Sequence, residues 1–335
     1  MPFSDAQLKI GQFSYANLQG SNGFSYAIPN RVERNTAGFG FLELMFALTI
    51  ALAIGVTAFQ LWTQNQNAFN DQNLVVQAQA NTRGTAMQIE QDLTMIGQGV
   101  PVYSSTFDTT PIEAVQPILS GSNATAVYFR AGKTNAFTEV ATTPNIDLTI
   151  GASTSLTVAN ASLFSNALGT STPQGRFVYI WGQTSNGWGW VRAQLTSITT
   201  ATNTISVTPA QTGTSGLDPN GFTRFTKKPT VSLEEGESFY LSGNSVVRGT
   251  VTDFTNPTTP EFGATKTIAN NITALTFAYY DKNNNLVNPN TLADRATITR
   301  VDVQVTTQTA RFLSNNIQPT FPGLVRTNPR NLNMR

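Results

Sequence analysis

A single carboxylate, Glu43, interrupts a long apolar stretch of this sequence. It is the sole formal charge between Arg34 and Asp71. The 24 residues Phe39–Trp62 read FGFLELMFALTIALAIGVTAFQLW, and about 20 such residues let a helix cross a bilayer core. A carboxylate at the bilayer centre costs about 2.5–3.5 kcal/mol on insertion, and less near a helix end. Glu43 therefore either lies at the interface, where the helix dipole favours it, or pairs with a positive group of another chain.

The side chains that most often carry out catalysis are missing. The 335 residues include no Cys and no His, which excludes disulfides, thiolate nucleophiles, Cys/His zinc sites and Ser-His-Asp triads. Lys and Arg total 20 against 19 acidic residues, and Lys227-Lys228 is too small a basic patch for nucleic acid. We expect no enzyme, no cofactor, no metal and no nucleic-acid partner. A carboxylate-based hydrolase needs no His, but no paired acids stand in a recognisable setting.

Two acidic segments are candidate cation sites. Asp281–Asn285 places oxygen ligands at alternate positions, as a calcium loop does. The full pattern needs Gly at position six and an acid at twelve, where this chain has Leu286 and Leu292. A hairpin turn is therefore expected there. Glu234–Glu237 holds three acids around a glycine, and we expect a solvated corner.

Several aromatic residues cluster around one predicted hairpin. Asn186-Gly187 signals the turn, with Trp181 before it and Trp188 and Trp190 after it. Because side chains alternate along a strand, Phe177, Tyr179 and Trp181 of the preceding strand Phe177–Trp181 are expected on one face. Core packing is the expected use of these rings. The alternative is that exposed rings stack on sugars or another surface ligand.

A helix is predicted from residue 39 to residue 97, with 39–62 crossing the membrane. The apolar run is too long for a cleaved secretory signal, and no Ala-x-Ala pattern follows it. Beyond it the pattern stays helical while the sequence turns polar. The apolar residues Ala86, Ile89, Leu93 and Ile96 recur at spacings of three and four, which predicts one buried face. A weaker stripe upstream consists of Phe69, Val76 and Ala80.

From residue 98 to residue 335 the pattern predicts a β-rich globular head, so the fold class is α+β. Short runs rich in β-branched and aromatic residues alternate with turn signals. Those runs are Ala126–Arg130, Phe177–Trp181, Trp190–Leu195, Thr204–Thr208, Leu233–Tyr240, Ser245–Arg248, Ile272–Tyr280 and Ile298–Thr306. A Thr/Ser/Asn-rich middle part, about 141–230, is a candidate insertion.

The residues around Glu43 resemble the processing site of type IV prepilins and pseudopilins. That family has a Gly, then a Phe or Met that becomes residue one, then a Glu at mature position five. Gly38, Phe39 and Glu43 occupy these three positions. The segments Ile272–Asp281 and Ile298–Val305 look like the closing strands of PilW-like minor pilins and J-type type II secretion pseudopilins. The resemblance covers the first and last quarters of the chain after Gly38.

The resemblance implies a leader of residues 1–38, cleavage after Gly38 by a prepilin peptidase, and N-methylation of Phe39. In the family, the Glu at mature position five neutralises the N-terminal amine of a neighbouring subunit. This leader is longer than usual, and a start at Val32 would give an ordinary one. The implied partners are other major and minor pilins.

The chain is accordingly expected in the bacterial inner membrane, with a periplasmic head, and then in a pilus at the cell surface. A PilW-like minor pilin that helps to initiate or cap a type IV pilus is the leading interpretation. A type II secretion minor pseudopilin is the alternative within the same family. A pilus-displayed adhesin, whose head binds a surface or glycan ligand, is a further alternative.

Overall fold

The computed structural model describes residues 40–101, 111–141, 145–213, 222–263, 265–329 and 332. It consists of one long helix, α1, Phe41–Thr94, followed by a region built mainly of strands. The predicted α+β class is confirmed. Contacts divide the chain into two compact units, one ending at Leu61 and the other beginning at Trp62. Each unit is described by itself.

The second unit includes the polar half of α1, which buries one face. Ala86, Ile89, Leu93 and Ile96 are all buried, as their spacing predicts. The upstream prediction was wrong, because Phe69, Val76 and Ala80 are exposed. In this part of the helix the buried side chains are instead the small residues Ala78, Thr82 and Thr85. Two threonines on the buried face conceal the stripe from a pattern that scores apolar residues alone.

The strands of the second unit form three antiparallel sheets among the described residues. The first has the order β1-β10-β11-β12, and β13 also pairs with β11; the second has the order β15-β14-β16-β17. Their bounds are β1 Ala126–Arg130, β10 Gly236–Ser242, β11 Ser245–Asp253, β12 Glu261–Phe262, β13 Lys266–Asn270, β14 Ile272–Asp281, β15 Leu286–Val287, β16 Ile298–Gln308 and β17 Thr320–Thr327.

The third sheet lies between β1 and β10 in the sequence. Its order is β2-β9-β5-β6-β7-β4, and β8 pairs with both β3 and β5. Its bounds are β2 Phe137–Glu139, β3 Ile146–Thr149, β4 Thr154–Thr157, β5 Phe177–Thr184, β6 Gly187–Thr199, β7 Thr204–Thr212, β8 Phe222–Phe225 and β9 Thr230–Leu233. The short helices are α2, Ser162–Leu168, and α3, Leu292–Thr297, with 3-10 turns η1 at Glu113–Val115 and η2 at Thr200–Thr202.

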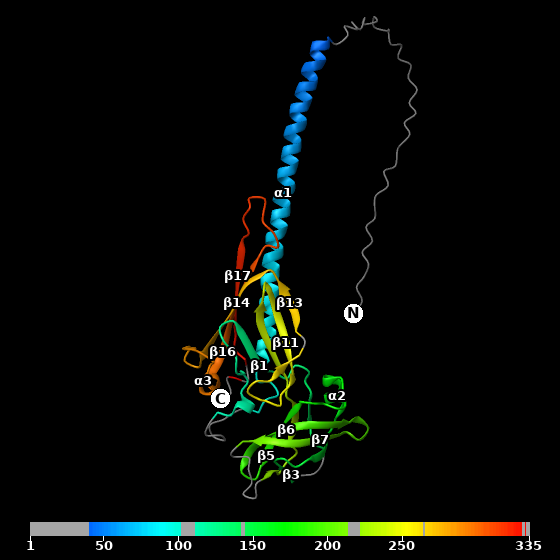
Figure 1. Ribbon diagram of the computed structural model, residues 1–335, viewed down its shortest axis with the longest axis vertical. Coiled ribbons are helices and arrows are strands. Elements are labelled where there is room, and N and C mark those ends of the chain that lie inside the picture. The colour runs from blue at the N-terminus through cyan, green and yellow to red at the C-terminus, as the bar shows by residue number, and fades with distance from the viewer. Residues whose placement is uncertain are drawn as a thin grey trace, which may run out of the picture. The chain divides into compact units, whose positions relative to one another are not determined.

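Two main hydrophobic clusters fill the second unit. The first joins the buried face of α1 to the first two sheets, through residues such as Ile89, Phe129 and Val303. Figure 1 shows the lower part of α1 running beside these strands. The second cluster belongs to the third sheet and includes Ile180 and Phe164, the latter from α2. The third sheet therefore has an apolar core of its own, separate from the core that α1 shares with the first two sheets.

The strand prediction was confirmed for seven of the eight runs named from the sequence, although most strands extend beyond the runs. The run Leu233–Tyr240 is interrupted, because β9 ends at Leu233 and β10 begins at Gly236. The pattern also missed several short strands, and the longest described strand that it missed is β17, Thr320–Thr327, which pairs with β16. This strand carries Pro322 and Gly323, two residues that disfavour strands and are tolerated mainly at edges. Its position at the end of the second sheet meets that condition.

We predict that Ile89→Ala lowers the free energy of unfolding by about 2–5 kcal/mol, because it leaves a cavity in the first cluster. Ile89 is 0% exposed. Met87→Ala, two residues away in the same helix, is the matched control, because Met87 is 66% exposed. Urea unfolding of the detergent-solubilised chain, followed by circular dichroism, measures both changes. Equal losses in the two variants would contradict the packing described here.

Candidate functional site

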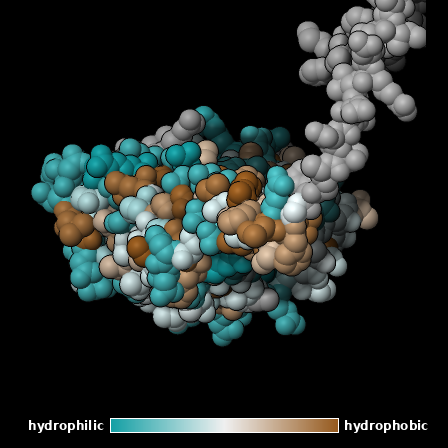
Figure 2. Space-filling model, turned by 90° about the horizontal axis from the view of Figure 1, so that it is seen from above, coloured by the Kyte–Doolittle hydropathy of each residue, from teal (hydrophilic) through white to brown (hydrophobic). Residues whose placement is uncertain are grey.

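The apolar half of α1 exposes its large hydrophobic side chains all around the helix. From Phe41 to Leu61 every residue is exposed, and the most apolar 18-residue window of the helix is 0% buried. It is long and apolar enough to cross a membrane. The face of the molecule seen in Figure 2 mixes hydrophilic and hydrophobic residues. A continuous apolar surface of this length needs lipid or other protein chains to cover it.

Glu43 lies in the first turn of this helix. The backbone N–H groups of Glu43 and Leu44 donate to the carbonyl oxygen of Gly40, at 2.9 and 3.1 Å, so the helical hydrogen bonds begin at Gly40. A carboxylate in a first turn is favoured by the helix dipole. Its side chain is exposed. The other two predicted processing residues, Gly38 and Phe39, lie outside the described residues.

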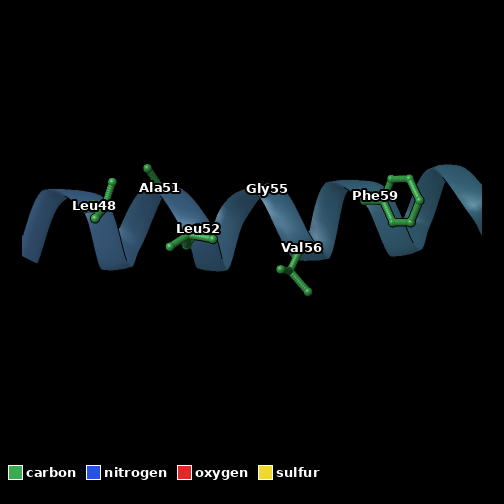
Figure 3. A pocket seen from close by; sticks show the side chains of 6 residues that line it. All are labelled: Leu48, Ala51, Leu52, Gly55, Val56 and Phe59. Atoms are coloured by element: carbon green, nitrogen blue, oxygen red, sulfur yellow. The ribbon is translucent and has the colours of Figure 1, made fainter.

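Small residues form a shallow notch on one side of the apolar helix. Figure 3 shows Ala51 and Gly55 flanked by larger side chains. The flanking residues are Leu48, Leu52, Val56 and Phe59. A Cβ atom built on Gly55 would meet nothing within 4 Å. Because small residues let two helix backbones approach closely, this surface suits contact with another apolar helix, and it offers no group for chemistry.

A threonine contact attaches the polar half of α1 to the second sheet. The hydroxyls of Thr82 and Thr307 lie 2.5 Å apart, and Thr307 also donates to the carbonyl oxygen of Ala78 at 3.0 Å. On β17, a Cβ added to Gly323 would lie 2.6 Å from Cγ2 of Thr82. The close approach of strand and helix therefore requires glycine at position 323.

A second link is ionic and attaches the end of α1 to the first sheet. The Lys133 ammonium lies 3.1 Å from Asp92 Oδ1 and 2.9 Å from Glu237 Oε1. Arg248 approaches the same two carboxylates at 3.6 and 3.7 Å. Burial raises the pKa of the Glu237 carboxyl, and the nearby charge of Asp92 adds to this effect. Two cations therefore offset two largely buried acids where the helix ends.

Glu234 stands at the centre of a fully buried ionic group, which corrects the expected solvated corner at Glu234–Glu237. Its Oε1 lies 2.7 Å from Arg130 Nε, and its Oε2 lies 2.7 Å from Arg192 Nε. The Tyr179 hydroxyl donates to Oε1 at 3.0 Å. Glu234 and Arg130 have no exposed side-chain surface. The sequence pattern missed this because its cationic partners are 104 and 42 residues away along the chain.

Peptide carbonyls accept further hydrogen bonds from both guanidinium groups. Arg130 donates to the carbonyl oxygens of Glu113, Gln116 and Pro257, at 2.7–3.0 Å. Arg192 donates to that of Phe254. These bonds join β1 of the first sheet, β6 of the third sheet and two loops. The group is thus a structural connection between the two sheets.

The remaining candidate sites have structural roles in the described part of the chain. Asp281 accepts hydrogen bonds from the backbone N–H groups of Asn283 and Asn285, each at 2.8 Å, so it closes the β14–β15 hairpin as predicted. The side-chain amide of Asn285 also donates to Asp281 Oδ2 at 3.0 Å. This side-chain bond, followed by the backbone bonds, holds the pKa of the Asp281 carboxyl below its ordinary value. Among the described residues no group of three or more Asp or Glu side chains could hold a metal ion.

The aromatic prediction was confirmed in its main point. Phe177 and Tyr179 are buried, as is Trp190, and Trp181 is half-buried. Strand pairing places Thr184 opposite Gly187 in the β5–β6 hairpin, at the predicted turn. Trp188 departs from the prediction, since it is 58% exposed.

Comparisons with known proteins found a likeness among solved structures but none among sequences. No family model and no curated protein sequence matches this chain. A solved structure of a type IV-like pilin from Thermus thermophilus is similar over 51% of this chain and 94% of that chain. The sequence identity is 11% and the TM-score is 0.22.

We predict that Glu234→Gln lowers the free energy of unfolding by about 3–5 kcal/mol, because it leaves the buried guanidinium groups of Arg130 and Arg192 without their anion. Asp147→Asn is the control. Asp147 pairs with Arg224 at 2.6 Å, but both side chains are 40% exposed, and such pairs contribute little. Urea unfolding of both variants measures the difference. A loss for Glu234→Gln no larger than the control's would refute the central role of this group.

Proposed function

We propose that this chain is a subunit of a type IV pilus or a related filament: a PilW-like minor pilin that takes part in pilus initiation or in the tip complex. The observation that carries the proposal is the helix that begins at Phe41. It is apolar, uncovered along its first half, and carries one carboxylate in its first turn. The preceding residues, Gly38 and Phe39, complete the resemblance to a prepilin processing site.

The helix suits two environments in turn. In the inner membrane, lipid covers its apolar side chains while the head lies in the periplasm. In a filament, other pilin helices take the place of lipid, and the notch at Gly55 lets one of them approach closely. Because both environments are apolar, transfer between them exposes little hydrophobic surface to water.

Glu43 is the assembly contact in this proposal. Cleavage by prepilin peptidase after Gly38 frees the amine of Phe39, which is then N-methylated. A carboxylate in an apolar surround is costly unless a cation pairs with it, and the amine of a neighbouring subunit is such a cation. Pairing is favoured only when two subunits are in the correct axial position, so the single charge selects the register of assembly.

In this proposal the head consists of a core part, formed by the first two sheets, and an inserted part, formed by the third sheet. The first two sheets pack on α1, whereas strands β2–β9 build the third sheet within Phe137–Leu233. We assign residues 1–38 to the leader, 39–97 to the helix and 98–335 to the head, with an insertion at about 141–230. The alternative assignment is a minor pseudopilin of a type II secretion system, which shares the helix and the closing strands.

The direct test of processing is mass spectrometry of the mature N-terminus. We expect a chain that starts at N-methylated Phe39 when the protein is expressed with its prepilin peptidase, and an uncleaved chain in a strain without the peptidase. Gly38→Val is the matched variant and is expected to remain uncleaved. An intact leader on wild-type protein in the presence of peptidase would overturn the proposal.

We further predict that Glu43→Ala leaves membrane insertion intact but reduces incorporation into filaments. Removal of the carboxylate makes insertion easier, while the neighbouring amine loses its partner. Thr49→Ala is the control, because the Thr49 hydroxyl donates within its own helix, to the carbonyl oxygen of Met45 at 2.8 Å. Immunoblots of membranes and of sheared filaments measure the two steps. Equal amounts of Glu43→Ala and wild-type protein in sheared filaments would contradict the assembly role.

A further inference from the structure

A cavity of about 230 Å³ lies on the third sheet, next to the segment that follows α1. Its lining comes from three strands and three connecting segments. The strands are β2, β5 and β9, and the segments are the chain just after α1, the loop between β1 and β2, and the connection between β9 and β10. It is smaller than the pockets of about 300–1,000 Å³ that take drug-sized ligands, so it suits a single ring.

Two aromatic side chains form the apolar part of the lining. Strand pairing sets Phe137 opposite Ser232 and Ser232 opposite Tyr179, and Trp181 follows Tyr179 by two residues. Phe137 and Trp181 therefore lie on the same face of the sheet, and both line the cavity. Phe137 is 56% exposed and Trp181 is half-buried. This face is opposite the one that packs in the second hydrophobic cluster.

Amide and carboxylate groups form the polar part. Gln98 Nε2 donates to Asn135 Oδ1 at 3.1 Å. Within the described part of the chain, Gln98 Oε1 and Asn135 Nδ2 have no hydrogen-bond partner. Glu235 Oε2 accepts from the backbone N–H of Thr134 at 3.0 Å. Burial raises the pKa of the Glu235 carboxyl.

Backbone hydrogen bonds hold the lining in place. The Gly132 N–H donates to the Gln98 carbonyl oxygen at 2.8 Å, and the Leu233 N–H donates to that of Ala136 at 2.9 Å. The Ser232 hydroxyl donates to the carbonyl oxygen of Gly99. A Cβ on Gly132 would lie 3.1 Å from the Gln98 carbonyl oxygen. The cavity is therefore preformed, which reduces the entropy lost on binding.

We propose that this cavity binds one neutral pyranose ring of a glycan. The C–H face of the sugar packs on Trp181 and Phe137, and its hydroxyl groups bond to Asn135, Gln98 and Glu235. Sugar hydroxyls both donate and accept hydrogen bonds. They can therefore accept from Asn135 Nδ2 and donate to Gln98 Oε1 and to the Glu235 carboxylate. Among the described residues no Lys or Arg lines the cavity, which disfavours acidic sugars and phosphates. The site does not depend on whether the chain enters a filament.

The test uses the full chain in a polyoxyethylene detergent, because maltoside and glucoside detergents carry the probe's own chemistry. The probes are the methyl pyranosides of glucose, galactose, mannose and N-acetylglucosamine. Tetramethylammonium is tested separately, because a site of aromatic rings and a carboxylate could instead bind an organic cation. Ligand-observed NMR titration measures binding. We expect saturable binding of at least one pyranoside, with a Kd of about 1 mM for a ligand of this size.

Two exposed lining residues provide variants that keep the fold. Asn135→Gly removes the amide and is compatible with the backbone φ of 52°; Phe137→Ser removes a ring that is largely exposed. Each is expected to weaken pyranoside binding about tenfold. Trp188→Ala, which removes an exposed ring of the same sheet outside the cavity, is the control and is expected to bind as wild type does.

Three results would overturn the proposal: no saturable binding of any pyranoside by folded wild-type protein, unchanged affinity in both cavity variants, or binding of tetramethylammonium alone. A thermal unfolding curve for each variant establishes that it is folded. Because the assay uses unassembled protein, its failure leaves the filament proposal standing. Conversely, an uncleaved leader would leave the binding result intact.

Discussion

The burial of one carboxylate between two guanidinium groups is the constraint on which the head depends. Glu234 follows β9 of the third sheet, Arg130 ends β1 of the first, and Arg192 lies on β6. Each charge is costly to bury alone, and the cost is offset only when all three meet. The peptide carbonyls that complete the guanidinium bonds come from loops near residues 113–116 and 254–257. Sheets and loops are therefore held in one arrangement.

The two halves of α1 meet opposite physical requirements. From Ala78 to Leu93 the helix buries one face through small and apolar side chains, with Thr82 bonded to the second sheet. From Phe41 to Leu61 every residue is exposed in the described part of the chain. An apolar surface of that kind is stable only in lipid or against other chains, so half of the helix holds the head and the other half needs a partner.

Sequence patterns predicted those elements whose residues repeat locally. Ile89 and its neighbours follow a helical period, and Ala126–Arg130 is strand β1 as predicted. The stripe through Phe69 and Val76 was wrong because the head contacts another face of the helix, which carries threonine. Glu234 was placed in solvent because adjacent acids usually lie there. Long-range pairing reversed that expectation, and no local pattern reports it.

The apolar helix, the lone carboxylate at Glu43 and the α+β class could all be predicted from the order of the residues, because they follow from composition and from periods of two and 3.6 residues. Which side chains meet became known from the folded chain alone. The ionic group at Glu234 and the cavity at Trp181 each join segments from distant parts of the chain. Burial and hydrogen bonding depend on which residues are neighbours in space, and local sequence patterns do not identify neighbours that are distant along the chain.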